Sequence, residues 1–239
     1  KLNALTVRDG GVLELLTGWS ATENSAQEIA LDGGTIRIRH NKAQAFNVPS
    51  NASAVNWKLK VGEKGARIDG EHEQTFSSSS SYRGISWYLM AETAEGLETD
   101  GGVEFAYPGY LKFFCSQAVS GPVAISDGFQ QLEPGMFSEG LDGSVFGTGD
   151  FTLDCGWLQV DASNDQGLKL ASGAGAKFTY GRSAALCTRM AGKAAGSVQT
   201  FTIGPADATS SPIVRKGKGS VLLLATGVTS SAPYVGDSK

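Results

Sequence analysis

Histidine and cysteine, two residue types that often serve in metal binding and catalysis, are scarce in this sequence. The 239 residues include only three cysteines, Cys115, Cys155 and Cys187. They are widely spaced and form no Cys-x-x-Cys pair, which argues against a disulfide framework and against a structural zinc site. Each lies in an apolar run, where a cysteine is expected to be a small buried side chain. We therefore predict no metal site and no cofactor.

The two histidines, His40 and His72, have no neighbours that favour catalysis. His40 ends an alternating segment and is expected at an exposed strand end. His72 stands between Glu71 and Glu73, and on a strand the two carboxylates would face away from the histidine. Whether these three residues serve a function stays open. Metalloprotease, EF-hand, Walker and Gly-x-Ser-x-Gly patterns are all missing. The sequence thus predicts no catalytic residue, and we expect a protein that is not an enzyme.

Charge is also low, since Asp, Glu, Lys and Arg make up 18% of the chain, against roughly 25% in typical soluble domains. The net charge of −4 gives no basic face for nucleic acid. The segment "VRKGKG" (214–219) is expected to be a solvated loop. No apolar run approaches the roughly 20 residues that span a bilayer, so we predict no transmembrane segment.

Glycine is abundant, with 32 residues, and it separates short segments in which apolar and polar residues alternate. In "TIRIRH" and "VNWKLKV" every second residue is apolar, which is typical of a strand with one buried and one wet side. Many such segments, interrupted by Gly, Asp, Asn or Pro, predict an all-β fold. We expect a sandwich, barrel or jelly-roll of antiparallel sheets with at most one or two short helices. The best helix candidate is 182–196, for which a strand is nearly as good an interpretation.

The chain is expected to form a single β domain over residues 1–239. The serine run at 76–84 predicts a solvated loop, and it is also where a division into two units would fall. Residues from about 228 to 239 are small and polar, which predicts a tail or an arm that reaches a neighbouring subunit.

The segment "GGVEFAYPGYLKFFCS" (101–116) combines a Pro-Gly pair with several bulky side chains. Alternation places Val103, Phe105 and Tyr107 on one face. Pro108 and Gly109 fit a type II turn, whose twist suits a splayed hairpin or a corner between sheets better than a tight hairpin. We interpret the segment as a core-forming corner.

Four aromatic residues are the candidates for contact with a neighbouring subunit or a ligand. Trp87 and Tyr88 are adjacent, and adjacent positions on a strand face opposite sides, so one of them should point outward. Tyr107 or Tyr110, whichever faces outward, is expected to contact a neighbouring subunit. The four candidates are Tyr107, Tyr110, Trp87 and Tyr88.

Three segments resemble the tryptophan RNA-binding attenuator-like β-fold family, which includes a mitochondrial-biogenesis protein and its bacterial relatives. They are "EIALDGGTIRIRH" (28–40), "GVEFAYPGYLKFF" (102–114) and "VRKGKGSVLLLATG" (214–227), and they cover under a fifth of the chain. The resemblance implies a β-rich, oligomerising and non-enzymatic protein. It implies no catalytic residue.

Our preferred hypothesis is a structural subunit that assembles with copies of itself and with other assembly proteins. Few charges are typical of surfaces buried in assemblies. Together with the many small residues and the expected all-β body, the low charge favours a virion coat, tail or decoration protein or another extracellular assembly. A lectin-like or adhesin-like module that binds glycans or a cell surface is a second hypothesis. An attenuator-like oligomer of cellular origin is a third. A hydrolase with two carboxylates is the fourth, because such pairs leave no local spacing.

Overall fold

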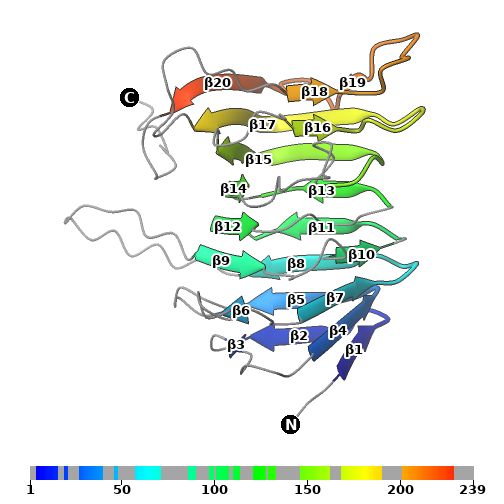
Figure 1. The fold of residues 1–239 in the computed structure, drawn as a ribbon, viewed down its shortest axis with the longest axis vertical. Coiled ribbons are helices and arrows are strands. Elements are labelled where there is room, and N and C mark those ends of the chain that lie inside the picture. Colours follow the sequence, from blue (N-terminus) through cyan, green and yellow to red (C-terminus); the bar gives the residue numbers. More distant parts are fainter. Residues whose placement is uncertain are drawn as a thin grey trace, which may run out of the picture.

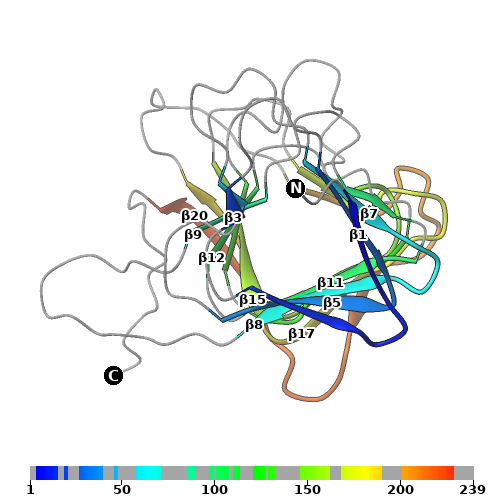
Figure 2. The same ribbon diagram turned by 90° about the horizontal axis from the view of Figure 1, so that it is seen from below.

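The computed structural model shows a chain that winds as a parallel β-helix, with its turns stacked along one long axis (Figure 1). The structure describes residues 4–15, 19–20, 27–39, 46–47, 57–70, 86–89, 97–99, 101–107, 110–113, 121–127, 129–132, 146–161, 168–189 and 201–228. Within these ranges there are strands, turns and bends but no helix. Seen along the long axis, successive turns lie over one another (Figure 2).

Each full turn passes through up to three faces, and the strands of each face stack in parallel. The first face contains β1 (Ala4–Arg8), β4 (Gln27–Asp32), β7 (Trp57–Val61) and β10 (Leu97–Thr99), and later β16 (Leu168–Leu170) and β18 (Phe201–Ile203).

The central face has a strand in every turn. It contains β2 (Val12–Leu15), β5 (Gly34–Ile38), β8 (Ala66–Gly70), β11 (Val103–Ala106), β13 (Val123–Ile125), the first part of β15 (Phe151–Asp161) and of β17 (Phe178–Arg189), and β19 (Ile213–Arg215).

The third face contains β9 (Ser86–Leu89), β12 (Tyr110–Phe113), β14 (Phe129–Leu132), the second part of β15 and of β17, and β20 (Leu222–Val228). β3 (Trp19–Ser20) and β6 (Phe46–Asn47) pair with each other in the two lowest turns. Because β15 and β17 run through the corner between two faces, they join the central and third faces into one twelve-stranded sheet.

The core is built from columns of side chains that lie one above another at equivalent positions of the central face. One inward column contains Gly34, Ala66, Val103, Val123, Phe151, Phe178 and Ile213. A second contains Ile36, Ile68, Phe105, Ile125 and Leu153, each at most 1% exposed. Burial of a large apolar side chain contributes about 1.5–3 kcal/mol, so these columns supply much of the stability.

The aromatic residues of the core continue this stacking. The rings of Phe151 and Phe178 lie nearly parallel, with centroids 6.1 Å apart and an interplanar angle of 5°. Phe146 packs against Phe151 from the preceding turn segment, at a centroid distance of 5.5 Å. Offset stacking of this kind adds to the free energy gained by burial alone.

The expectation of antiparallel sheets in a sandwich, barrel or jelly-roll is wrong, because the paired strands form large parallel sheets. Alternation was interpreted as the mark of antiparallel sheets, whose second face is often solvated. A β-helix produces the same alternation in parallel strands, since each strand turns one side to the interior of the coil and the other to solvent. The described strands pair in parallel with strands of neighbouring turns, so no β-hairpin joins them.

Several local predictions from the sequence can be compared with the strands of the coil. The strand interpretation of the 182–196 segment is confirmed as far as Arg189, where β17 ends. Pro108 and Gly109, where a corner was predicted, lie outside the described residues. The strands on either side have different neighbours, since β11 pairs with β8 and β13 while β12 pairs with β9 and β14. Val103, Phe105 and Tyr107 all face the core, as alternation predicted. The serine run at 76–84 and residues 229–239 lie outside the described residues.

We predict that Gly101→Ala destabilises the fold by about 1–3 kcal/mol, the usual cost of overpacking. A Cβ atom at Gly101 would lie 2.3 Å from the carbonyl oxygen of Glu63 and from the amide nitrogen of Gly65. Both are backbone atoms of the turn below and cannot move independently. Urea unfolding followed by circular dichroism measures the effect. Gly217→Ala is the control, because a Cβ there meets nothing within 4 Å; equal losses in both variants would contradict the close stacking of corners.

Candidate functional site

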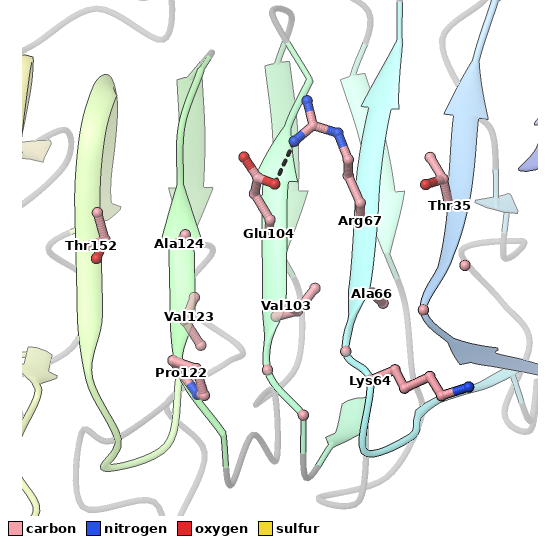
Figure 3. A pocket seen from close by; sticks show the side chains of 15 residues that line it. Thr35, Lys64, Ala66, Arg67, Val103, Glu104, Pro122, Val123, Ala124 and Thr152 are labelled. Carbon is pink, nitrogen blue, oxygen red and sulfur yellow. Dashed lines mark hydrogen bonds and ion pairs between the residues drawn. The ribbon is translucent and has the colours of Figure 1, made fainter. Parts of the chain in front are cut away.

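An open groove crosses five turns on the outside of the corner between the first and central faces (Figure 3). Its volume is about 440 Å³, which is within the range of ligand sites. Corner residues Gly33, Gly34, Gly65, Gly101, Gly102 and Pro122 line its floor. Outward-facing residues of the central face flank it, namely Thr35, Arg67, Glu104, Ala124 and Thr152, with Lys64 at the corner.

The groove exists because the corner needs residues without side chains. Gly33, Gly65 and Gly102 have φ values of +73°, +73° and +87°, which only glycine adopts without strain. Close approach adds a second requirement, since a Cβ at Gly102 would lie 2.4 Å from the carbonyl oxygen of Pro122. Stacked corners made of glycine leave a depression along the axis.

Backbone hydrogen bonds hold successive corners at a fixed height. The first central-face residue of one turn donates its N–H to a carbonyl oxygen of the next turn. Ala66 donates to Gly102 at 3.1 Å, Val103 to Pro122 at 2.9 Å and Val123 to Asp150 at 2.9 Å. The position of every groove residue therefore follows from this ladder.

A row of charged side chains lies on the outer surface beside the groove. Arg37 donates two hydrogen bonds to Asp69, at 2.9 and 3.1 Å. Arg67 lies between two carboxylates and donates to Asp69 at 3.2 Å and to Glu104. The hydroxyl of Ser126 donates to the other oxygen of Glu104 at 2.6 Å. The row therefore alternates in sign from turn to turn, and each carboxylate has a cationic partner.

These contacts lower the pKa values of both carboxyl groups. For Asp69, the hydrogen bonds from Arg37 are the largest cause of the lowered pKa. For Glu104, partial burial raises the pKa, but hydrogen bonds from Ser126 and Arg67, with the charge of Arg67, outweigh it and give a lowered pKa. Arg67 likewise keeps a raised pKa although desolvation opposes its charge. All three groups are charged at neutral pH.

This chemistry suits recognition better than proton transfer. A glycosidase of the two-carboxylate type needs one carboxyl group with a raised pKa to act as general acid, whereas Asp69 and Glu104 are shifted the other way. Histidine, cysteine and serine are not among the described lining residues. The groove offers threonine hydroxyls, one lysine and a paired Arg-Glu couple to a bound molecule.

The aromatic candidates lie elsewhere. Tyr107 is fully buried, and burial raises the pKa of its hydroxyl, so it is a core residue and presents no surface to a ligand or a neighbour. Trp87 and Tyr88 lie on β9 and Tyr110 on β12, both on the third face, and their side chains are outside the described part of the structure.

The remaining candidates from the sequence are only partly described. His40, Glu71, His72 and Glu73 fall outside the described residues. Cys187 is buried and free, and burial raises the pKa of its thiol to about 12, so it is an inert core residue as predicted. The loop expected over 214–219 is only partly correct, because Val214 and Arg215 belong to β19. The residues from 216 to 219 are exposed and outside any strand.

The groove was not predicted from the sequence, although a repeated Asp-Gly-Gly triplet marks the corners that form it. The triplet Asp-Gly-Gly occurs at 9–11, 32–34 and 100–102. Each copy immediately precedes a strand of the central face. The first two are in register, since Gly10 donates to the carbonyl of Gly33, but the third is shifted by one residue so that Gly102 occupies the place of Gly33. A repeat with a variable period and a shifted register is hard to recognise.

Within the described ranges, no group of three or more His, Cys, Asp or Glu side chains could hold a metal ion. In the same ranges no helix is long and apolar enough to cross a membrane.

Comparison with known proteins adds no relative. No family model matches the chain, and neither a curated protein nor a solved structure matches it. The resemblance to the attenuator-like family therefore stays an expectation.

We predict that Glu104→Gln makes stability less dependent on pH in the acid range. Because the pKa of Glu104 is lowered in the folded state, its contribution is present above its unfolded pKa and is lost as the pH falls through the folded pKa. Between about pH 5 and pH 3 the wild type should lose more stability than the variant. Urea midpoints over this range measure it. Glu14→Gln is the control, because Glu14 and Arg39 form an exposed pair, which contributes little. Parallel pH profiles of wild type and Glu104→Gln would contradict the prediction.

Proposed function

We propose that this chain is a non-catalytic structural subunit, a stiff β-helical rod that assembles with copies of itself. The proposal rests on the position of the exposed apolar side chains, which lie mainly at one end of the coil. Within the described ranges five large apolar side chains are exposed, and four of them belong to the last turn: Ile213, Val221, Leu223 and Leu224. A terminal turn that exposes its apolar residues is a surface for association, because repeat folds need a polar cap at a solvated end.

The apolar side chains of the last turn expose enough surface for their burial to stabilise an association. Leu224 is 65% exposed, although its register partner one turn below, Leu186, is fully buried. Full burial of such a side chain contributes about 1.5–3 kcal/mol, so a partner that covers the end of the coil would gain substantially. The central part of the coil has no comparable apolar surface among its described residues.

The virion is the assembly that we propose, as a coat, tail or decoration component. The low charge of the chain supports this, together with a fold in which backbone ladders run the length of a rod and resist bending. Immunogold labelling of particles purified from the native source tests the location. Label that stays in the particle-free fraction would contradict a virion role.

We expect the wild type to have a mass above the 24.9 kDa of one chain in light scattering at high protein concentration. Leu224→Asp should weaken association roughly tenfold or more, because burial of one large apolar side chain is lost, while the unfolding midpoint changes little. Ala174→Asp is the matched control, since Ala174 is an exposed turn residue before β17 and does not belong to the last turn. A wild type that remains a monomer would overturn the proposal.

A second candidate function is recognition of a glycan in the groove, because the groove offers hydroxyl and charged groups along several turns. The double variant Thr35→Val/Thr152→Val removes two hydroxyls with little change in volume. It should weaken glycan binding roughly tenfold if each hydroxyl makes one hydrogen bond. Thr179→Val is the control, since Thr179 occupies the same column one turn beyond Thr152 and outside the groove. A glycan array without any signal for the wild type would remove this function.

A further inference from the structure

We propose that copies of this chain associate head to tail, with the last turn of one copy continuing into the first turn of the next as one parallel β-helix. The inference rests on the proposed self-assembly and names its geometry. Within the described ranges, β19 pairs only with β17 at one end and β2 pairs only with β5 at the other. Both strands are therefore edges of the same face, and an unpaired edge is a template for another strand.

The alternating N–H and C=O groups on the two edges are placed so that those of one edge could bond those of the other. At the first turn, the carbonyls of Gly11 and Leu15 accept from β5, so the peptide groups of the alternate residues Val12 and Glu14 point to the open edge. At the last turn, the alternation is the reverse of this. Pro212 and Lys216 bond to β17, which leaves Ile213 and Arg215 directed outward. The peptide groups of Ile213 and Arg215 in one copy can therefore form hydrogen bonds with those of Val12 and Glu14 in the next. The register used inside the chain then aligns Val214 with Val12 and Lys216 with Glu14.

The backbone N–H of Ile213 has no carbonyl of a following turn to donate to among the described residues. Its predecessors in the inward column, from Ala66 to Phe178, donate N–H to a backbone carbonyl of the following turn. Ile213 instead donates to the hydroxyl of Ser211, at 3.3 Å. A side chain of the same turn thus takes the place of the next turn, and a second copy would restore the backbone acceptor.

The side chains that would meet are complementary in size. Continuation of the register places Ile213, which is 42% exposed, beneath Gly11 of the next copy, and Val214 beneath Val12, which is 45% exposed. A large apolar residue therefore faces a glycine in the inward column. In the outward column two valines cover each other.

Charge also matches across the junction. The outward column that begins at Glu14 continues through Arg37 to Asp69, so its sign alternates. Lys216 occupies the same place in the last turn, since it follows Arg215 as Glu14 follows Leu13. A continued coil would place Lys216 opposite Glu14 of the next copy and preserve the alternation. Both groups already have a partner within the chain, Asp154 for Lys216 and Arg39 for Glu14, and the Lys216 and Glu14 side chains remain 53% and 42% exposed.

One position in the fit is unfavourable. Arg215 extends the column of Leu13 and Tyr180, where a charged group must keep its head in solvent while its aliphatic stem covers apolar neighbours. Arg215→Leu should therefore strengthen association, by roughly tenfold. The association that results is heterologous, which generates filaments or rings of copies rather than a closed symmetric pair.

The experiment uses two variants of the whole chain, each with one blocked edge. Val12→Pro removes a donor from the first edge, and Arg215→Pro removes one from the last edge, while neither N–H is needed inside the chain. We expect each variant alone to be a monomer in sedimentation velocity. An equal mixture should form a dimer that does not grow, because only one open end of each kind remains. Circular dichroism and cooperative melting confirm that both variants fold.

The outcomes separate the two proposals. A monomeric wild type overturns both. A wild type that assembles while the mixture stays monomeric, or while either blocked variant assembles alone, overturns the head-to-tail geometry but not self-assembly. If a proline variant does not fold, charge reversal replaces it. Glu14→Lys should then weaken association roughly tenfold, and Glu14→Lys combined with Lys216→Glu should restore it. Failure of the double variant to restore association also overturns the geometry.

Discussion

The backbone ladder at the corner between the first and central faces is the constraint on which the rest of the structure depends. The N–H groups from Ala66 to Phe178 in one inward column each reach a carbonyl of the following turn, at 2.9–3.1 Å. Such a ladder requires every turn to have the same height and to bend at the same place. Glycines with positive φ meet the second requirement, and the variable loops between turns can change in length without disturbing it.

The same constraint produces both the core and the groove. In-register stacking places like positions above one another, so apolar residues form continuous columns such as the one from Ile36 to Leu153. On the outside it aligns Arg37, Asp69, Arg67 and Glu104 into a row of alternating charge. The missing side chains of the corner glycines align too, and they leave the groove. Interior stability and surface chemistry are thus two results of one register.

Among the described strands of the central face, only the two at the ends of the coil lack a second neighbour. Inside the chain each strand of the central face has a neighbour above and below, whereas β2 and β19 each have one neighbour among the described strands. The last turn also exposes Ile213 and Leu224, whose register partners Phe178 and Leu186 are fully buried. Exposed apolar side chains and unpaired strand edges are therefore concentrated at the ends among the described residues, and our proposal places association there.

The sequence by itself determined which residues form strands and which of their sides is buried, as at Val103, Phe105 and Tyr107, because alternation depends only on the local period of a strand. It also predicted that Cys187 is a buried side chain. It did not determine that strands pair in parallel, since a coil with a solvated outside has the same alternation as an antiparallel sheet. Pairing joins residues 20 to 37 positions apart along the central face, from Val103 to Val123 and from Ala66 to Val103. Only the tertiary structure decided this register, because it is set by the height of each turn and not by loop length, and the groove and the two open edges follow from it.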